Sequence, residues 1–155
     1  MPAAKAVRGV AVFFIVSRSK VCASRTLTRH RYCDMNHCST TGGYEATRSL
    51  LVLKHPPTAI FCQNDRTALG CYDALREAGL VVPGDVSVVG YDDEEISRHL
   101  RPKLTTCVLP HRAMGRWTID HLQEYESKPR DRQHYPITKI ECSLVPRESE
   151  GPPST

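Results

Sequence analysis

Two short apolar segments with an amphipathic helix between them constrain the fold of this chain more than any other feature. Residues 58–63 (TAIFCQ) and 86–91 (VSVVGY) are almost entirely apolar, which is typical of strands buried on both faces. Residues 65–78 have helical periodicity, Gly79 can end the helix, and the apolar stripe consists of Ala68, Leu69, Tyr72, Leu75 and Ala78. This order predicts a parallel strand–helix–strand unit with a right-handed crossover, and therefore an α/β fold.

The flanking segments extend the same pattern. The sequence predicts a helix over 41–54 that the HPP motif at 55–57 stops, a short helix over 96–100 and strands over 104–108 and 135–145. Residues 112–126 predict a further helix, with an expected buried stripe of Met114, Trp117, Thr118, His121, Leu122 and Tyr125. Trp117 on this stripe favours core packing over sugar stacking, and the tail RESEGPPST is expected to be loose.

Polar residues follow both strands of the central unit. One strand ends at Gln63, Asn64 and Asp65, and the other ends at Tyr91-Asp92-Asp93, followed by Glu94 and Glu95. Because the carboxyl ends of parallel strands meet at one edge of a sheet, these side chains are expected to lie together. Amides and carboxylates suit sugar hydroxyls, which both donate and accept hydrogen bonds. The alternatives stay open: Asp65 is also a good helix cap, and the acids after Tyr91 also suit a helix start.

The seven cysteines and the charge distribution bear on the compartment and on the partners. An odd number of cysteines without a CxxC pair argues against a secreted, disulfide-stapled domain and favours a cytoplasmic location. The longest apolar run, at 10–16, is much shorter than the roughly 18 to 20 residues of a membrane span, so we predict a short strand there and no membrane partner. Residues 1–40 carry a net charge of +6 and the rest −2, which indicates two regions.

Patterns for catalysis or metal binding are missing from the sequence. No Gly-rich phosphate loop, GxSxG elbow or HExxH motif occurs, so an enzyme and a bound cofactor are not expected, although a carboxylate pair with a nearby His could perform acid–base chemistry. His30, Cys33, His37 and Cys38 lie close together, but their spacing matches no standard structural zinc site, and we predict no metal.

Four stretches resemble a known family: GGYEATRSLL, PTAIFCQNDRTALGCYDALREAGLVVPGDVSVVGYDD, LRPKLTTCVLPHRAMGRWTIDHL and SLVPRES. They are similar to the carboxyl-terminal half of the sugar-sensing domain of LacI/GalR-family transcriptional regulators. The motifs ND-x-x-A-x-G, VPGDVSVVGYDD and LTT-x-x-x-P occur in the family's order. The resemblance implies a strand–helix–strand lobe of a type I periplasmic-binding-protein-like fold at 41–149, after an atypical, poorly ordered basic region (1–40) and before a tail (150–155).

The resemblance also implies roles for particular residues. A small-molecule effector, a sugar or similar polyol, would be bound by Asn64, Asp65, Asp92 and His111. A homodimer surface would include Ala68, Cys71, Tyr72, Leu75, Ile96 and Leu100. Tyr91 is interpreted as structural.

The sequence departs from the family in its first 40 residues. No helix-turn-helix pattern occurs there, so binding to operator DNA is expected only through a domain that this chain lacks. Most of the amino-terminal lobe is also missing, and the helix at 112–126 would then lack its usual sheet and be loosely docked or pack against another chain. The alternative functions are a dimerisation remnant that binds no ligand and a sugar-binding transport protein.

Overall fold

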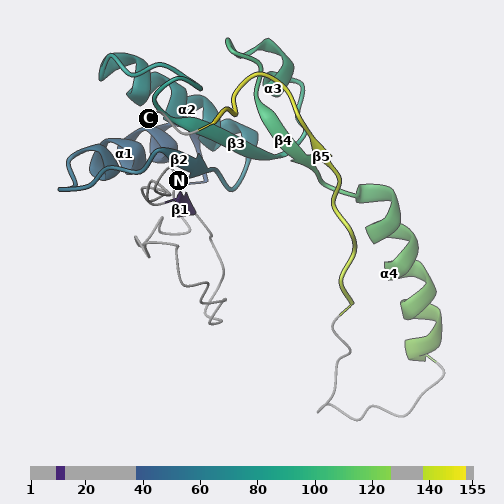
Figure 1. Cartoon of the computed structure of the whole chain (residues 1–155). Helices are drawn as coiled ribbons and strands as arrows, with labels where there is room; N and C mark the ends of the chain where they lie inside the picture. The colour runs from purple at the N-terminus through teal and green to yellow at the C-terminus, as the bar shows by residue number, and fades with distance from the viewer. Residues whose placement is uncertain (1–9, 13–37, 127–137, 153–155) are drawn as a thin grey trace, which may run out of the picture.

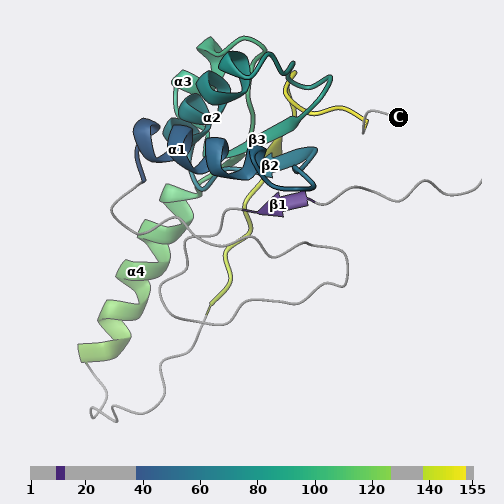
Figure 2. The ribbon, with the colours of Figure 1, turned by 90° about the vertical axis from the view of Figure 1, so that its left-hand side faces the viewer.

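The computed structural model describes residues 10–12, 38–126 and 138–152. A five-stranded sheet has the order β1-β2-β3-β4-β5, in which the first four strands are parallel and β5 runs antiparallel to β4. Helices α1 and α2 lie together on one face of this sheet (Figures 1 and 2). The expected α/β class with a parallel sheet is therefore confirmed. The strands are β1 (Val10–Val12), β2 (Ala59–Phe61), β3 (Ser87–Asp92), β4 (Thr105–Val108) and β5 (Leu144–Val145).

The central unit β2–α2–β3 forms as predicted, with one difference at the start of its helix. Helix α2 (Asp65–Glu77) is capped by Asn64, whose side-chain oxygen accepts the backbone N–H of Thr67 at 2.8 Å. Asp65 is thus the first helical residue and not the cap, because its carboxylate is engaged elsewhere. The chain leaves the helix through Gly79, whose φ of 71° lies in the left-handed region that favours glycine.

Helix α1 (Thr40–Leu51) packs directly against α2. Its N-cap is Ser39, which accepts the backbone N–H of Gly42 at 3.1 Å, and it ends at Leu51, before the HPP motif. The two helices approach closely because each contributes a glycine: a Cβ on Gly43 would overlap the carbonyl of Thr67, and one on Gly70 would overlap the carbonyl of Thr40. This contact fixes the position of α2 over the sheet.

The hydrophobic core lies between these helices and the sheet. Ile60 of β2, Val88 of β3 and Leu104, directly before β4, belong to this core and are at most 1% exposed. The core also contains five of the six side chains that the resemblance placed on a dimer surface, with exposed fractions of 0% for Ala68, Cys71 and Leu75 and 8% for Tyr72 and Leu100.

Ala68, Cys71 and Leu75 therefore have no exposed area to offer a second chain, and a dimer surface at this place stays a prediction. The Tyr72 hydroxyl is also used within the chain, where it donates to the carbonyl of Pro102 at 3.1 Å. Ile96, which begins the short helix α3 (Ile96–His99), is half-buried, and its role in a dimer stays a prediction.

The carboxyl-terminal segment is more ordered than expected. Within the described residues 138–145 of the predicted strand, only β5 forms, but the chain beyond it is bonded to β3 and β4. The Ser149 carbonyl accepts the N–H of Val88 at 2.8 Å, and the Gly151 N–H donates to the Ser87 hydroxyl at 3.2 Å. The described part of the tail is thus held against the sheet.

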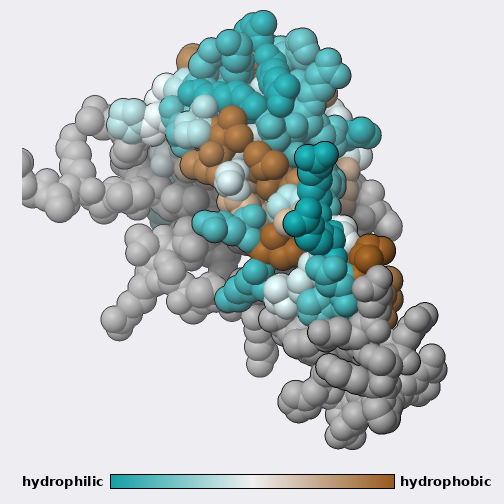
Figure 3. Space-filling model, turned by 90° about the vertical axis from the view of Figure 1, so that its right-hand side faces the viewer, coloured by the Kyte–Doolittle hydropathy of each residue, from teal (hydrophilic) through white to brown (hydrophobic). Residues whose placement is uncertain are grey.

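Helix α4 (His111–Glu126) projects away from the rest of the molecule in both ribbon views (Figures 1 and 2). It packs closely against no other helix or strand in the described part of the chain. The stripe that we expected to be buried is open at two of its large apolar residues, since Met114 is 42% exposed and Leu122 is 56% exposed, whereas Trp117 and His121 are half-buried. Figure 3 shows apolar side chains on this side of the molecule, over the strands and on α4.

The apolar run at 10–16 contributes strand β1, which pairs with β2 in the register Val10↔Ala59. The predicted strand is therefore confirmed over three residues. The rest of the region predicted to be poorly ordered falls outside the described residues, except for Cys38–Thr40. No described helix is both long and apolar enough to cross a membrane.

Candidate ligand-binding edge

The carboxyl ends of β2 and β3 meet as the sequence predicted. Asn64 and Asp65 follow β2, and Asp92 ends β3 opposite Val108 of β4. The two ends are joined directly, because the backbone N–H of Glu94 donates to the Asp65 carboxylate at 2.8 Å. His111 follows β4 by three residues, at the start of α4. All four predicted ligand residues therefore belong to one edge of the sheet, but their side chains differ in burial and in hydrogen bonding.

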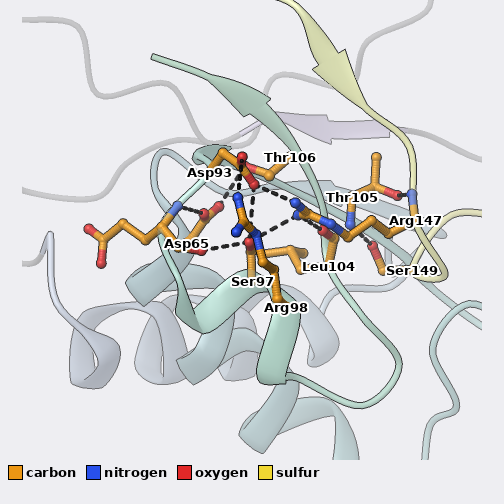
Figure 4. A network of polar contacts seen from close by, with 10 residues as sticks. Asp65, Asp93, Ser97, Arg98, Leu104, Thr105, Thr106, Arg147 and Ser149 are labelled. Atoms are coloured by element: carbon orange, nitrogen blue, oxygen red, sulfur yellow. Dashed lines mark hydrogen bonds and ion pairs between the residues drawn. The ribbon is translucent and has the colours of Figure 1, made fainter. Parts of the chain in front are cut away.

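Asp65 is a buried structural carboxylate. Its side chain is 0% exposed, and besides Glu94 it accepts the Thr106 hydroxyl at 2.7 Å (Figure 4). Gly90 makes room for it, since a Cβ there would overlap the Asp65 side chain. Burial raises the pKa of Asp65 to about 6, although the hydrogen bonds from Thr106 and Glu94 act to lower it. A carboxylate enclosed in this way ties α2 to β3 and β4 and is closed to a ligand.

Asp93 belongs to an ion-paired cluster that was not predicted from the sequence. Its carboxylate pairs with Arg98 at 3.1 Å and closely with Arg147, which lies just after β5 (Figure 4). Burial acts to raise the pKa of Asp93, but the two guanidinium groups outweigh it and hold the pKa below its ordinary value. Arg147 also donates to the Leu104 carbonyl at 2.7 Å and the Ser97 hydroxyl at 2.9 Å. The only sequence signal for this residue was its place in SLVPRES.

Asp92 is the carboxylate that remains open. It is half-buried, and its side chain takes no hydrogen bond within the described residues. Its φ of 110° is unusual for a residue other than glycine, so the backbone at this position is strained. Burial and the nearby Glu94 raise the pKa of Asp92, while His111 and Arg66 act to lower it. Asp92 therefore combines partial burial with an unused set of acceptor lone pairs.

Amide groups follow β2, at the same edge of the sheet as this carboxylate. The Asn64 oxygen is used in capping α2, which leaves its NH₂ group without a partner in the described part of the chain. The NH₂ group of Gln63, one residue earlier, is buried and likewise lacks a partner among the described residues. Unpaired buried donors are rare in proteins, and a bound ligand or water is the usual reason for one. Gln63 was noted in the sequence but not assigned as a ligand residue.

His111 is exposed at the start of α4 and faces Asp92 closely enough to affect its pKa. The pair of donors from β2, the acceptor from β3 and the imidazole beyond β4 form a mixed set of groups around the same edge. A set of this kind can bind several hydroxyls of one small polar molecule at once. No group of metal-binding side chains occurs in the described residues. Fold and edge thus define an α/β lobe with a polar set of side chains at the carboxyl ends of its strands, where ligands gather in open α/β sheets.

Comparison with known proteins identifies the family. A model of the periplasmic binding protein-like domain matches residues 18–150. The ribose operon repressor of Haemophilus influenzae is 36% identical over 114 residues, which are 74% of this chain and 34% of the repressor. The lactose operon repressor of Rhizobium radiobacter is 42% identical over 82 residues, which are 53% of this chain and 73% of that protein. The chain therefore belongs to the periplasmic binding protein-like family, in the branch of the LacI-type repressors.

Solved structures agree with this assignment. The lac repressor dimer bound to operator and the anti-inducer ONPF is 35% identical, with a TM-score of 0.62 over 72% of this chain and 38% of that chain. A LacI family regulator from Enterococcus faecium with bound ribose is 32% identical, with a TM-score of 0.57 over 74% of this chain and 41% of that one. These relatives are transcriptional regulators and not enzymes. The chain spans about a third of the length of the ribose operon repressor.

Proposed function

We propose that this chain is the effector-sensing part of a LacI-type transcriptional regulator, and that its effector is a sugar or a similar polyol. The observation that carries this proposal is the presence, at one edge of the sheet, of the open Asp92 carboxylate and of the amides of Asn64 and Gln63, which have no partner among the described residues. A relative with bound ribose supports the same class of ligand. In this proposal the chain is cytoplasmic, performs no catalysis, and acts as a homodimer. Operator DNA would be bound through other parts of the regulator.

The roles of the edge residues follow from what each side chain has left to offer. Asp92 would accept hydrogen bonds from two sugar hydroxyls, and the Asn64 amide would donate to a hydroxyl oxygen. His111 would contribute a ring nitrogen from the side of α4. Asp65 would act indirectly, because its bonds to Glu94 and Thr106 fix the strand ends that carry Asn64 and Asp92.

Calorimetric titration of the chain with ribose and a panel of hexoses tests this proposal. Asp92→Asn removes a charged acceptor while keeping the side-chain shape, so binding should weaken by roughly 10- to 150-fold, the equivalent of about 1.5–3 kcal/mol. Asp73→Asn is the matched control, since Asp73 lies on the exposed side of α2 and pairs with Arg76. Equal affinities for the two variants, or no saturable binding to any sugar by the parent chain, would refute the proposal.

A further inference from the structure

A cluster of three side chains next to the candidate edge is not used in the proposed function. Tyr91 lies on β3, Cys107 lies on β4, and Cys142 precedes β5 by two residues. The Tyr91 hydroxyl and the Cys142 sulfur are 3.3 Å apart. Sequence reasoning took Tyr91 to be structural and gave these two cysteines no role.

The sheet register places Cys107 between the other two residues. Tyr91 pairs directly with Cys107, and Cys107 pairs with Leu144, so β4 separates Tyr91 from the β5 side. Cys142 is two residues from Leu144 and therefore lies on the same face of the sheet as Cys107, as its diagonal neighbour. The contact between Tyr91 and Cys142 thus reaches over β4 on the face that carries the Cys107 side chain.

Both thiols are accessible, unlike the other pair of neighbouring cysteines in the described residues. Cys107 and Cys142 are each half-buried, whereas Cys62 and Cys71 are 1% and 0% exposed in the core. A small oxidant can therefore reach the first pair in the folded protein, and reaching the second would require the core to open.

The electrostatic environment gives the two thiols different roles. The hydrogen bond with Cys142 and burial raise the pKa of Tyr91 to about 12, so its phenol stays protonated at neutral pH. The Tyr91 hydroxyl can therefore donate a hydrogen bond to the Cys142 sulfur 3.3 Å away, whereas the Cys107 sulfur has no hydrogen-bond partner among the described residues. Burial, together with the nearby Cys142, raises the pKa of Cys107, which keeps that sulfur as a thiol until an electrophile forms beside it.

We propose that Cys142 and Cys107 form a peroxide-reactive pair, in which Cys142 is oxidised first and Cys107 resolves it as a disulfide. The Cys142 thiolate attacks one oxygen of hydrogen peroxide, the O–O bond breaks, and sulfenic acid and hydroxide form. The Cys107 thiol then attacks the sulfenic sulfur, and its proton leaves with the sulfenic oxygen as water. The two electrons lost by the thiols are those gained by the peroxide.

The backbone around Cys142 can accommodate this bond. Diagonal neighbours in an antiparallel pair have Cα atoms about 7–8 Å apart, and a disulfide needs roughly 4.4–6.8 Å. Cys142 lies outside β5, which has two residues, and the bond from the Val108 N–H to the Ser143 carbonyl is the nearest ladder contact. A small shift of this segment toward β4 brings the sulfurs together. The disulfide would join the two ends of the chain segment that contains α4.

Peroxide treatment of the full chain at neutral pH, followed by peptide mapping in the mass spectrometer, tests the proposal. The expected product links Cys107 to Cys142, while Cys62 and Cys71 stay reduced. In Cys107→Ser, Cys142 should remain a sulfenic acid that dimedone traps, and in Cys142→Ser neither the disulfide nor a trapped Cys107 should appear. Tyr91→Phe should slow the first step several-fold at constant fold content by circular dichroism.

Three outcomes would overturn the proposal. One is the absence of the linked peptide under conditions in which exposed Cys38 is oxidised. Another is dimedone trapping on Cys107 in preference to Cys142. The third is oxidation of Cys62 and Cys71 at the same rate, which would mean that reactivity follows unfolding and not the site. None of these readouts depends on sugar binding, so the proposed function can fail without affecting this test.

Discussion

The buried carboxylate of Asp65 should make the stability of the lobe depend on pH. Its folded-state pKa of about 6 lies above its ordinary value of 3.8, so the folded state binds this proton more tightly than the unfolded state does. The stabilising contribution is therefore complete below the unfolded pKa and is lost as the pH rises through about 6. A difference of about 2 pKa units corresponds to roughly 3 kcal/mol in total, and about half of it falls between pH 5 and 7.5.

Asp65→Asn isolates this contribution. The amide oxygen can keep one of the two hydrogen bonds, and the Thr106 hydroxyl can rotate to accept from the new NH₂ group, so the variant should fold. Urea unfolding of both proteins at several values between pH 5 and 7.5 gives the free energy of unfolding of each. The difference between parent and variant should shift by roughly 1.5 kcal/mol in favour of the variant as the pH rises.

Taking that difference removes the contributions of titrating groups that do not interact with Asp65, and the lowered pKa of Asp93 acts in the opposite sense at more acidic pH. A difference that stays constant from pH 5 to 7.5 would refute the reasoning. It would mean that the hydrogen bonds from Glu94 and Thr106 fully offset the burial of the charge. A difference that moves in favour of the parent at high pH would show that they more than offset it.

Three further predictions follow from the packing and from the ion-paired cluster. Arg147→Lys should lower the free energy of unfolding by about 2–3 kcal/mol, because lysine cannot reach Asp93, Ser97 and the Leu104 carbonyl together; an unchanged urea midpoint would contradict this. Gly70→Ala should destabilise the chain by roughly 1–3 kcal/mol through its clash with α1, whereas the control Gly115→Ala, which meets nothing within 4 Å, should be neutral or stabilising by up to about 1 kcal/mol in thermal unfolding. Amide hydrogen exchange should be fast throughout α4 and slow in α2 at low protein concentration, and equal protection of both helices would show that α4 is docked.

The parts of the fold that were predictable from sequence rest on local patterns. Apolar runs marked β2 and β3, and the periodicity and Gly79 marked α2, because burial and helix geometry leave a signature within a few residues. The meeting of Asn64 with Asp92 was predictable for a related reason, since a parallel crossover fixes which strand ends share an edge.

Other features depend on contacts that no local pattern encodes. Asn64 and Asp65 are both good capping residues, and only the position of Thr106, 41 residues after Asp65, decides that Asp65 turns inward. The pairing of Asp93 with Arg147 and the attachment of Ser149 to β3 are equally remote in sequence. The apolar stripe on α4 was predictable from its periodicity, but periodicity does not show which element covers that face.

The separation of Arg147 from Asp93 along the chain has a consequence for synthesis. A ribosome adds Asp93 before Arg147, with 54 residues of separation, and at about 5–20 residues per second this takes roughly 3–10 s. Ser149, which joins β3 to β4, is added later still. During that interval α3, β4 and α4 are added, but Asp93 still lacks the Arg147 guanidinium that neutralises it. The ion-paired cluster around Asp93 therefore cannot close until the segment after β5 has been made.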